Sequence, residues 1–331
     1  GGTPGAGGSA LDGADYISIG GSMSASAVYR HSGADSLLVG GNATASTLVG
    51  GSDNDLVSVA GNLSVGEILG GSGVDSVIIT GSLVGAATVR LDASGSTEEA
   101  ADSITIGTIS SGVIYGESGA DTFNIGNIAR KASIYGGAQN DLVTVGNNFS
   151  SSLVEGEAGD DTVNVAAFIK STAKGGDGAD LVSASGVVSV GALYGNSGND
   201  SFVLTGVATS ASTYGGAGND SMTFGAAANT LTYEGGIGAD TLKVTGAINS
   251  STIYGDNASA VVAGADSISI GGTASGSYIY ANSGKDSVHI VRNVTASTVY
   301  LNTGDDSLSI DAGLIASTVY GGSGKDSVYI V

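Results

Sequence analysis

Aspartate is the residue type whose spacing along this chain could support chemistry. One Asp precedes a short run of alternating apolar residues again and again through the 331 residues. Eleven of the fifteen steps between these positions are 20 residues long, two are 19, and the other two, of 27 and 26, contain insertions. A register this constant predicts a repeat protein in which every such Asp occupies the same place in one structural unit. The sixteen positions are Asp15, Asp35, Asp55, Asp75, Asp102, Asp121, Asp141, Asp161, Asp180, Asp200, Asp220, Asp240, Asp266, Asp286, Asp306 and Asp326.

Glycine-rich turns lead into these Asp residues. The Gly two positions before the Asp is kept in thirteen of the sixteen units, and Asp53, Ala100 and Gln139 replace it in the others. Glycine reaches positive φ angles and leaves its carbonyl oxygen uncovered. Such carbonyls and one carboxylate would form an all-oxygen site, which suits calcium better than magnesium, since magnesium requires tight octahedral geometry and retains its waters. Five turns read GGxGxD in full: residues 70–75, 175–180, 215–220, 235–240 and 321–326.

The elements that position these turns are predicted to be short strands. After Asp286, the alternating residues Val288 and Ile290 indicate one strand, Val294 is expected to mark a corner, and residues 296–300 indicate a second strand. The density of glycine and the period of two argue against helix. One such unit cannot bury its own apolar face, but stacked units can, because each strand pairs in parallel with the strand one repeat later at about 4.8 Å.

The predicted fold is therefore all-β: a right-handed parallel β-solenoid of about 16 coils of about 20 residues, with two short strands per coil. Residues 1–9 are expected to be a loose linker, and residues 10–331 one continuous solenoid with insertions near residues 92–101 and 256–263. One column of the repeat is rich in tyrosine, for which we expect ring stacking between coils. Its members are Tyr29, Tyr115, Tyr135, Tyr194, Tyr214, Tyr254, Tyr280, Tyr300 and Tyr320.

The turns resemble the GGxGxDxUx nonapeptide of the RTX, or haemolysin-type, calcium-binding repeat family. The resemblance covers nearly the whole chain and implies an RTX-like β-roll with calcium between successive turns. It implies that the sixteen repeat Asp residues are ligands and that turn glycines shape the loops and offer carbonyls. Those glycines are Gly71, Gly73, Gly176, Gly178, Gly216, Gly218, Gly236, Gly238, Gly322 and Gly324.

The chain departs from the RTX pattern in the number of such turns. A typical RTX roll has two nonapeptides in each 18-residue coil, whereas this chain has one in about 20 residues, and its opposite turn, for example residues 81–86, carries no Asp. It thus resembles the single-column solenoids of giant bacterial adhesins and surface-layer proteins. The resemblance implies one calcium column with up to about fifteen sites.

A metal-free alternative is that each Asp caps its own loop through an Asx-turn. Stacking would then place carboxylates about 4.8 Å apart along the whole column, where like charges repel. Lys285 and Lys325 are too few to neutralise them. Calcium binding is therefore the preferred interpretation.

Charge limits the expected partners. The formal net charge is −21, from 31 acidic and 10 basic residues, so nucleic acid and anionic membranes are poor partners. No apolar run is long enough to insert in a membrane. The expected partners are calcium, and copies of the chain or adjoining coils and domains of a longer chain, with cell-surface polysaccharide as an alternative.

Catalysis is not expected, because the acids are spread evenly and the two histidines, His31 and His289, lie about thirteen coils apart. The sequence predicts a secreted structural protein, a rigid segment of a bacterial surface layer, surface fibre or adhesin. One alternative is a carbohydrate- or ice-binding adhesin module, although no regular Thr array supports ice binding. A remote alternative is a polysaccharide-acting β-helix enzyme with paired carboxylates.

Overall fold

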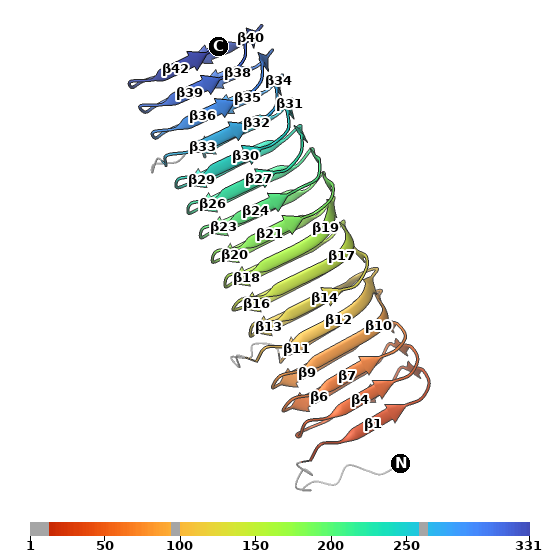
Figure 1. Ribbon diagram of the computed structural model, residues 1–331. Coiled ribbons are helices and arrows are strands. Elements are labelled where there is room, and N and C mark those ends of the chain that lie inside the picture. The colour runs from red at the N-terminus through yellow and green to blue at the C-terminus, as the bar shows by residue number, and fades with distance from the viewer. Residues whose placement is uncertain (1–12, 94–99, 258–263) are drawn as a thin grey trace.

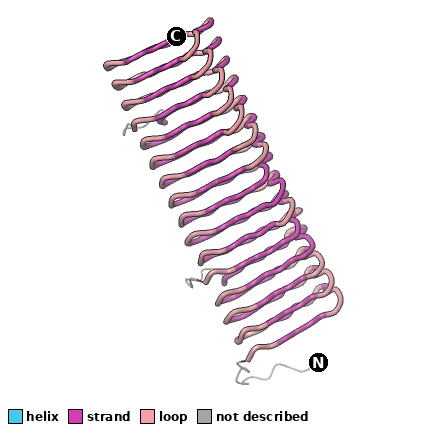
Figure 2. Tube along the Cα trace, in the orientation of Figure 1, coloured by secondary structure: helices cyan, strands magenta, loops and turns pink. Residues whose placement is uncertain are grey.

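The fold is that of a computed structural model, which describes residues 13–93, 100–257 and 264–331. The predicted linker of residues 1–9 lies outside the described residues, as do residues 94–99 and 258–263 of the insertions. The described residues form an elongated stack of coils in which every coil lies directly on the previous one (Figure 1). Figure 2 shows strands joined by turns and loops, with no helix in the described part of the chain. Nor do the described residues contain a helix long and apolar enough to cross a membrane.

Two parallel sheets run the length of the stack, and each coil contributes to both. The first sheet receives a strand that starts immediately after the repeat Asp in every coil. These strands are β1 (Tyr16–Ile19), β4 (Ser36–Val39), β7 (Leu56–Val59), β10 (Ser76–Val84), β12 (Ser103–Ile109), β14 (Thr122–Ile125), β17 (Leu142–Ser150), β19 (Thr162–Ile169), β21 (Leu181–Ala184), β24 (Ser201–Leu204), β27 (Ser221–Phe224), β30 (Thr241–Val244), β33 (Ser267–Ile270), β36 (Ser287–Ile290), β39 (Ser307–Ile310) and β42 (Ser327–Ile330).

A two-residue strand follows in most coils and belongs to the same sheet, so a coil has three strand segments rather than the two predicted. In the coils of β10, β12, β17 and β19 the longer strand runs through this position. The two-residue strands are β2 (Met23–Ser24), β5 (Ala43–Thr44), β8 (Leu63–Ser64), β15 (Ala129–Arg130), β22 (Val188–Ser189), β25 (Ala208–Thr209), β28 (Ala228–Asn229), β31 (Ile248–Asn249), β34 (Ala274–Ser275), β37 (Val294–Thr295) and β40 (Leu314–Ile315).

The second sheet consists of the strands that lead back to the glycine-rich turns. They are β3 (Ala27–Val28), β6 (Thr47–Ser52), β9 (Glu67–Ser72), β11 (Ala87–Asp92), β13 (Gly112–Ser118), β16 (Ala132–Ala138), β18 (Leu153–Ala158), β20 (Thr172–Asp177), β23 (Ala192–Ser197), β26 (Ser212–Ala217), β29 (Thr232–Ile237), β32 (Thr252–Asp256), β35 (Tyr278–Tyr280), β38 (Thr298–Tyr300) and β41 (Thr318–Tyr320).

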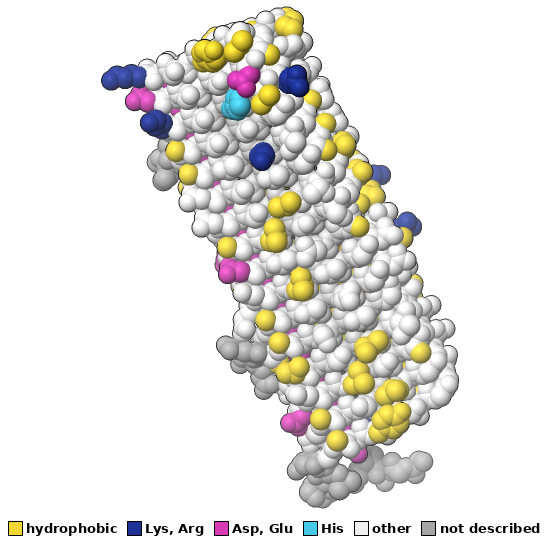
Figure 3. Space-filling model, in the orientation of Figure 1, with side chains coloured by type: hydrophobic (Ala, Val, Ile, Leu, Met, Phe, Trp, Pro, Cys, Tyr) yellow, Lys and Arg dark blue, Asp and Glu magenta, His cyan; other side chains and the backbone are white. Residues whose placement is uncertain are grey.

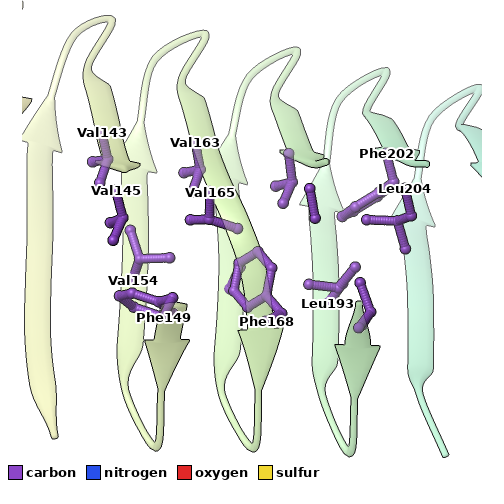
Figure 4. Close-up of a cluster of buried hydrophobic side chains, with 14 of the residues drawn as sticks. Val143, Val145, Phe149, Val154, Val163, Val165, Phe168, Leu193, Phe202 and Leu204 are labelled. Atoms are coloured by element: carbon purple, nitrogen blue, oxygen red, sulfur yellow. The ribbon is translucent and has the colours of Figure 1, made fainter. Parts of the chain in front are cut away.

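The core is a column of side chains enclosed between the two sheets. A representative coil supplies four of them, all buried: Val143, Val145 and Phe149 from β17 in the first sheet, and Val154 from β18 in the second. Figure 4 shows these side chains pointing into the same space, with their counterparts from the next coils beside them. The rings of Phe149 and Phe168 meet edge to face with centroids 5.4 Å apart. Period-two alternation therefore divides each strand into a buried face and a solvent face.

Register is preserved across both long repeats. Val77 pairs with Val57 one 20-residue step before it and with Ile104 one 27-residue step after it. Asp92 still pairs with Gly71, and Gly236 pairs with Asp256. Regular pairing therefore extends to Asp92 and Asp256, and the insertions near residues 92–101 and 256–263 stay a prediction.

The corner between the two sheets differs from the prediction. Val294 lies within β37 with its side chain buried, and the chain turns at Ala296, whose φ is +48°. The equivalent residue has positive φ in most coils although it is rarely glycine. Because alternation alone does not reveal a left-handed residue of ordinary type, the sequence placed the corner two residues too early. Examples at this corner are Ala25, Ala45, Val65, Lys131, Ser151, Lys170, Val190, Ser210, Thr230 and Ser250.

The tyrosine column stacks as expected wherever tyrosines are adjacent. Tyr280 and Tyr300 have ring centroids 4.8 Å apart and planes inclined by 1°. Other residues interrupt the column in several coils, for example between Tyr135 and Tyr194, where Lys174 forms an ion pair with Glu155. The stacked rings cover the outside of the second sheet and add contacts between coils.

Relief of strain at the left-handed corner gives a testable prediction. Val190 is β-branched, has a φ of +52° and is 54% exposed. Asparagine tolerates this conformation far better, so Val190→Asn should raise the free energy of unfolding by about 1 kcal/mol. Denaturant unfolding is the measurement. Val187 is similarly exposed, at 49%, and Val187→Asn is the matched control, which should give no gain. Equal effects of the two substitutions would show that the corner is not strained.

Candidate metal centre

The glycine-rich turns connect the second sheet to the first strand of the next coil. In the turn between β26 and β27, Gly216 and Gly218 have φ angles of +118° and +131°. These angles reverse the chain sharply and place Asp220 immediately before β27. The ten glycines predicted to shape the loops all have positive φ, from +97° at Gly322 to +136° at Gly178. Glu117, Gln139 and Asn196 adopt the same conformation in variant turns.

The repeat Asp side chains point into the turn rather than into solvent. Fourteen of the sixteen are buried, with exposed fractions between 1% and 4%, while Asp15 is exposed and Asp326 half-buried. Figure 3 shows acidic side chains along one edge of the stack that are largely covered by other atoms. The column that the sequence predicted is thus a single internal row of carboxylates. Burial of so many carboxylates requires each oxygen to find a partner.

One carboxylate oxygen of each Asp is used by the stack itself. The Oδ1 atom of Asp220 accepts a hydrogen bond from the backbone N–H of Asp200 at 2.8 Å, and Oδ1 of Asp240 accepts from Asp220 at the same distance. The pattern runs without a break from Asp15 to Asp326. Each Asp therefore caps the backbone of the preceding coil, not its own loop as the Asx-turn alternative assumed.

The second oxygen, Oδ2, has no such use. In thirteen of the fourteen buried repeat Asp residues it is inaccessible and has no hydrogen-bond partner among the described residues. A buried oxygen without a partner is costly, and a row of them is rare in native proteins. The thirteen are Asp55, Asp75, Asp102, Asp121, Asp141, Asp161, Asp180, Asp200, Asp220, Asp240, Asp266, Asp286 and Asp306.

Burial changes the acidity of this row. Desolvation raises the pKa of Asp220 from its ordinary value of 3.8 to about 6, against the opposing effect of the hydrogen bond from the Asp200 backbone. Desolvation, together with the charges of Asp161 and Asp121, raises the pKa of Asp141 to about 8 against the opposing effect of the hydrogen bond from the Asp121 backbone. Without a cation the row therefore resists full ionisation near neutral pH.

A backbone carbonyl oxygen of the following coil lies near the same space as Oδ2. Near the end of the second-sheet strand lies an inward-facing residue, here called the inner position, which is the first glycine of the GGxGxD turns. A Cβ atom added at Gly215 would collide with Oδ2 of Asp220 and with the carbonyl oxygen of Gly235. The same two kinds of oxygen crowd the inner glycine in nine turns, so glycine is required there for them to converge. The nine glycines are Gly50, Gly70, Gly116, Gly136, Gly156, Gly195, Gly215, Gly235 and Gly255.

The sequence analysis did not name the inner glycines as site residues; it named the two later glycines of each GGxGxD turn instead. The carbonyls of Gly71 and Gly236 accept backbone hydrogen bonds from Ala93 and Asn257 in the adjoining coil. The carbonyl oxygens of these two glycines therefore already accept hydrogen bonds from the backbone of the adjoining coil. The signal available in the sequence was the first Gly of each GGxGxD motif, whose inward orientation follows from counting two residues along the strand from the buried apolar residue.

The chemistry of the site is that of oxygen ligands alone. Among the described residues, no three His, Cys, Asp or Glu side chains gather into a group that could hold a metal. Each turn instead combines one carboxylate oxygen with a backbone carbonyl. Such a donor set fits a hard cation such as calcium and not zinc or copper, which prefer nitrogen and sulfur. Of the two histidines, His289 is partly exposed and pairs with Asp311, which is not one of the repeat Asp residues.

The opposite corner carries a neutral counterpart of the Asp ladder. The backbone N–H of Ser277 donates to Oγ of Ser297 at 2.9 Å, and Oγ of Ser297 donates to the carbonyl of Thr295. Related bonds join Ser251 to Ser277 and Leu231 to Ser251. A hydroxyl can therefore perform the stacking role without a charge. In both ladders a backbone N–H donates to a side-chain oxygen of the next coil. What the Asp row has in addition is a second oxygen, Oδ2, without a hydrogen-bond partner.

Comparisons with known proteins found few that are similar to this chain. No family model matches it, and no curated protein matches its sequence. One solved structure that it resembles is described as a hyperactive, Ca²⁺-dependent, β-helical antifreeze protein from an Antarctic bacterium. The two are 19% identical, with a TM-score of 0.48, and the match covers 98% of this chain and 81% of the other.

The raised pKa values predict an unusual dependence of stability on pH in the absence of divalent cations. An acid whose pKa is higher in the folded than in the unfolded chain stabilises the fold below the unfolded pKa, and this stabilisation is lost as pH rises through the folded pKa. The melting temperature in chelator should therefore fall between about pH 4 and about pH 8, the window set by the ordinary value of 3.8 and the raised value of Asp141. A thermal melt at each pH is the measurement.

The control is Asp220→Asn, which removes one ionisable group but keeps an oxygen for the hydrogen bond from Asp200. Its melting temperature should fall less over the same pH range. A melting temperature that rises with pH in chelator would contradict the proposed origin of the effect.

Proposed function

We propose that this chain is a calcium-stabilised, extracellular structural solenoid, a rigid segment of a bacterial surface layer, fibre or adhesin. The observation that carries the proposal is the row of buried Oδ2 atoms without partners, each beside an inner position that glycine keeps open. A divalent cation in this space would satisfy the oxygen and offset the repulsion between neighbouring carboxylates. The residues that would hold it are the repeat Asp and the inner-position carbonyl of the following coil.

Calcium is favoured over other cations by the donor set and by the demands of the turn. The available ligands are oxygens from flexible, glycine-rich backbone, which calcium accepts in irregular geometry and magnesium does not. Calcium-binding modules outside cells have dissociation constants on the order of 10⁻⁴–10⁻³ M, so a stack of such sites would be filled there. The extracellular location is therefore part of the same proposal. The resemblance of the turns to RTX repeats supports it.

The number of ions follows from the inner position. Ten inner glycines precede a further coil among the described residues, and at all of them except Gly175 the Asp oxygen and the carbonyl oxygen both crowd the inner position: Gly50, Gly70, Gly116, Gly136, Gly156, Gly175, Gly195, Gly215, Gly235 and Gly255. We therefore propose about ten ions rather than the fifteen that the Asp spacing alone implies. The other turns carry a side chain in this space or, at Gly321, lack the second oxygen nearby.

A structural role fits the rest of the molecule better than catalysis. The repeat carboxylates are spread along the stack at one per coil and are buried, so they do not form the exposed pair that glycosidic chemistry uses. The uniform coils and the formal charge of −21 suit a soluble rod. Proposed partners are calcium, and further copies of the chain or adjoining coils. Cell-surface polysaccharide is an alternative partner.

Calcium titration from a chelated start tests the proposal directly. Far-UV circular dichroism should show a cooperative gain of β-structure, or the melting temperature should rise, with calcium and not with an equal concentration of magnesium. A site filled at 100 times its dissociation constant adds about 2.7 kcal/mol to the free energy of unfolding. Asp220→Asn should reduce the calcium-dependent gain, while Ser251→Ala, in the neutral ladder, should lower stability equally with and without calcium. A chain fully folded in chelator and unmoved by calcium would refute the proposal.

Gly215→Ala tests the inner position as the place of the metal. The added methyl group would occupy the space between Oδ2 of Asp220 and the carbonyl of Gly235. We expect the variant to bind one calcium ion fewer per chain, counted by native mass spectrometry. Gly191→Ala is the matched control, because its Cβ would lie 3.5 Å from its nearest neighbours and Ala211 occupies the same position one coil later. An unchanged ion count in Gly215→Ala would place the metal elsewhere.

A further inference from the structure

The first turn in the described chain differs from the others at the inner position. Most turns have glycine there, but this turn has Arg30, which is only 6% exposed. Arg30 follows β3 and precedes Asp35, so its side chain enters the space in which Oδ2 of the repeat Asp lies in the other turns. A buried guanidinium is costly unless oxygens surround it.

The contacts of Arg30 are those of a cation held in an oxygen site. Its Nη1 atom lies 3.4 Å from Oδ2 of Asp35, and the side chains of both residues are 3% exposed. Nη1 also donates to the carbonyl of Asp15 at 2.9 Å, and Nη2 donates to the carbonyl of Ser36 at 2.5 Å. One carboxylate and two backbone carbonyls from neighbouring coils thus converge on one positive charge.

The effect on Asp35 separates this turn from the rest of the row. Asp35 is buried like the other repeat Asp residues, and its Oδ1 accepts the same backbone hydrogen bond, from Asp15 at 2.7 Å. Among the buried repeat Asp residues that the structure describes, it is the one whose Oδ2 has a partner. The orphaned oxygen disappears in the turn where the chain supplies its own cation.

Three other turns fill the inner position without supplying a charge. Leu91, Ala281 and Leu301 are fully buried there, and Oδ2 of the Asp in each of these turns, Asp102 or Asp286 for example, still lacks a hydrogen-bond partner. Occupied space alone therefore does not remove the unpaired oxygen. The property specific to Arg30 is its charge.

We propose that the guanidinium of Arg30 takes the place of a bound calcium ion in the turn between Arg30 and Asp35, so that this coil closes without metal. The inference rests on the proposed calcium column and adds to it a built-in counter-ion in the first turn that the structure describes. A coil that closes without metal gives the following coils a folded template even when calcium is scarce. The metal-dependent part of the stack would then begin at Gly50.

The test removes the internal cation and counts the metal. The full chain is stripped with chelator, loaded with calcium chloride and measured by native mass spectrometry. Arg30→Gly should bind one calcium ion more than the unmodified chain, and the double variant Arg30→Gly/Asp35→Asn should lose that ion. Arg292→Gly is the matched control, because Arg292 is exposed and the preceding coil has Gly272 at the same position. Its ion count should be unchanged.

Hydrogen exchange keeps the test decisive if the first coil opens in the variant. The Ser36 amide, bonded to the carbonyl of Asp15 at 2.8 Å, reports on this turn. Protection that is lost in chelated Arg30→Gly and restored by calcium supports the exchange of one cation for another. Protection that calcium cannot restore, or an unchanged ion count, overturns it. An unmodified chain that binds no calcium would overturn the proposed function itself, whereas failure of Arg30→Gly alone leaves the calcium column intact.

Discussion

The hydrogen bond from each Asp backbone N–H to the carboxylate one coil later is the interaction on which this solenoid depends. It runs from Asp15 to Asp326 and ties every turn to the next. It also fixes the carboxylate inside the turn, since Oδ1 can reach the backbone below only if the side chain points inward. The same geometry leaves Oδ2 buried, so the ladder that holds the stack together creates the electrostatic problem that a cation would solve.

Glycine at the inner position leaves room for the carboxylate that the ladder holds inside the turn. Where a coil has Gly215 or Gly235, the carboxylate and a carbonyl of the next coil approach the same space, and a methyl group would separate them. Where a coil has Arg30, the side chain brings its own charge to that space. The serine ladder at the other corner shows that stacking by itself needs only a neutral hydroxyl. An ionisable group in the ladder is therefore better explained by cation binding than by stacking.

Much of the fold could be predicted because repetition makes it a local problem. Residues such as Val288 and Ile290 alternate in every unit, and alternation decides which face of a strand is buried. The constant Asp spacing then sets the register, and the structure confirms the all-β parallel solenoid with coils of about 20 residues. The corner at Ala296 was misplaced because a left-handed residue of ordinary type leaves no mark in a pattern of hydrophobicity. The third strand segment was missed for the same reason.

The sequence by itself determined the repeat, the buried face of each strand, the glycine-rich turns with positive φ and the row of Asp residues, because each depends on residue type and spacing within one unit. Only the tertiary structure decided which carboxylate oxygen is used and which is orphaned, because that depends on the coil stacked next to it. It likewise showed that Arg30 meets Asp35 and that the inner glycines admit two oxygens. Arg30 meets Asp35 across a single turn, whereas the carbonyl at each inner glycine comes from the following coil, and both arrangements are set by how the coils stack rather than by any motif.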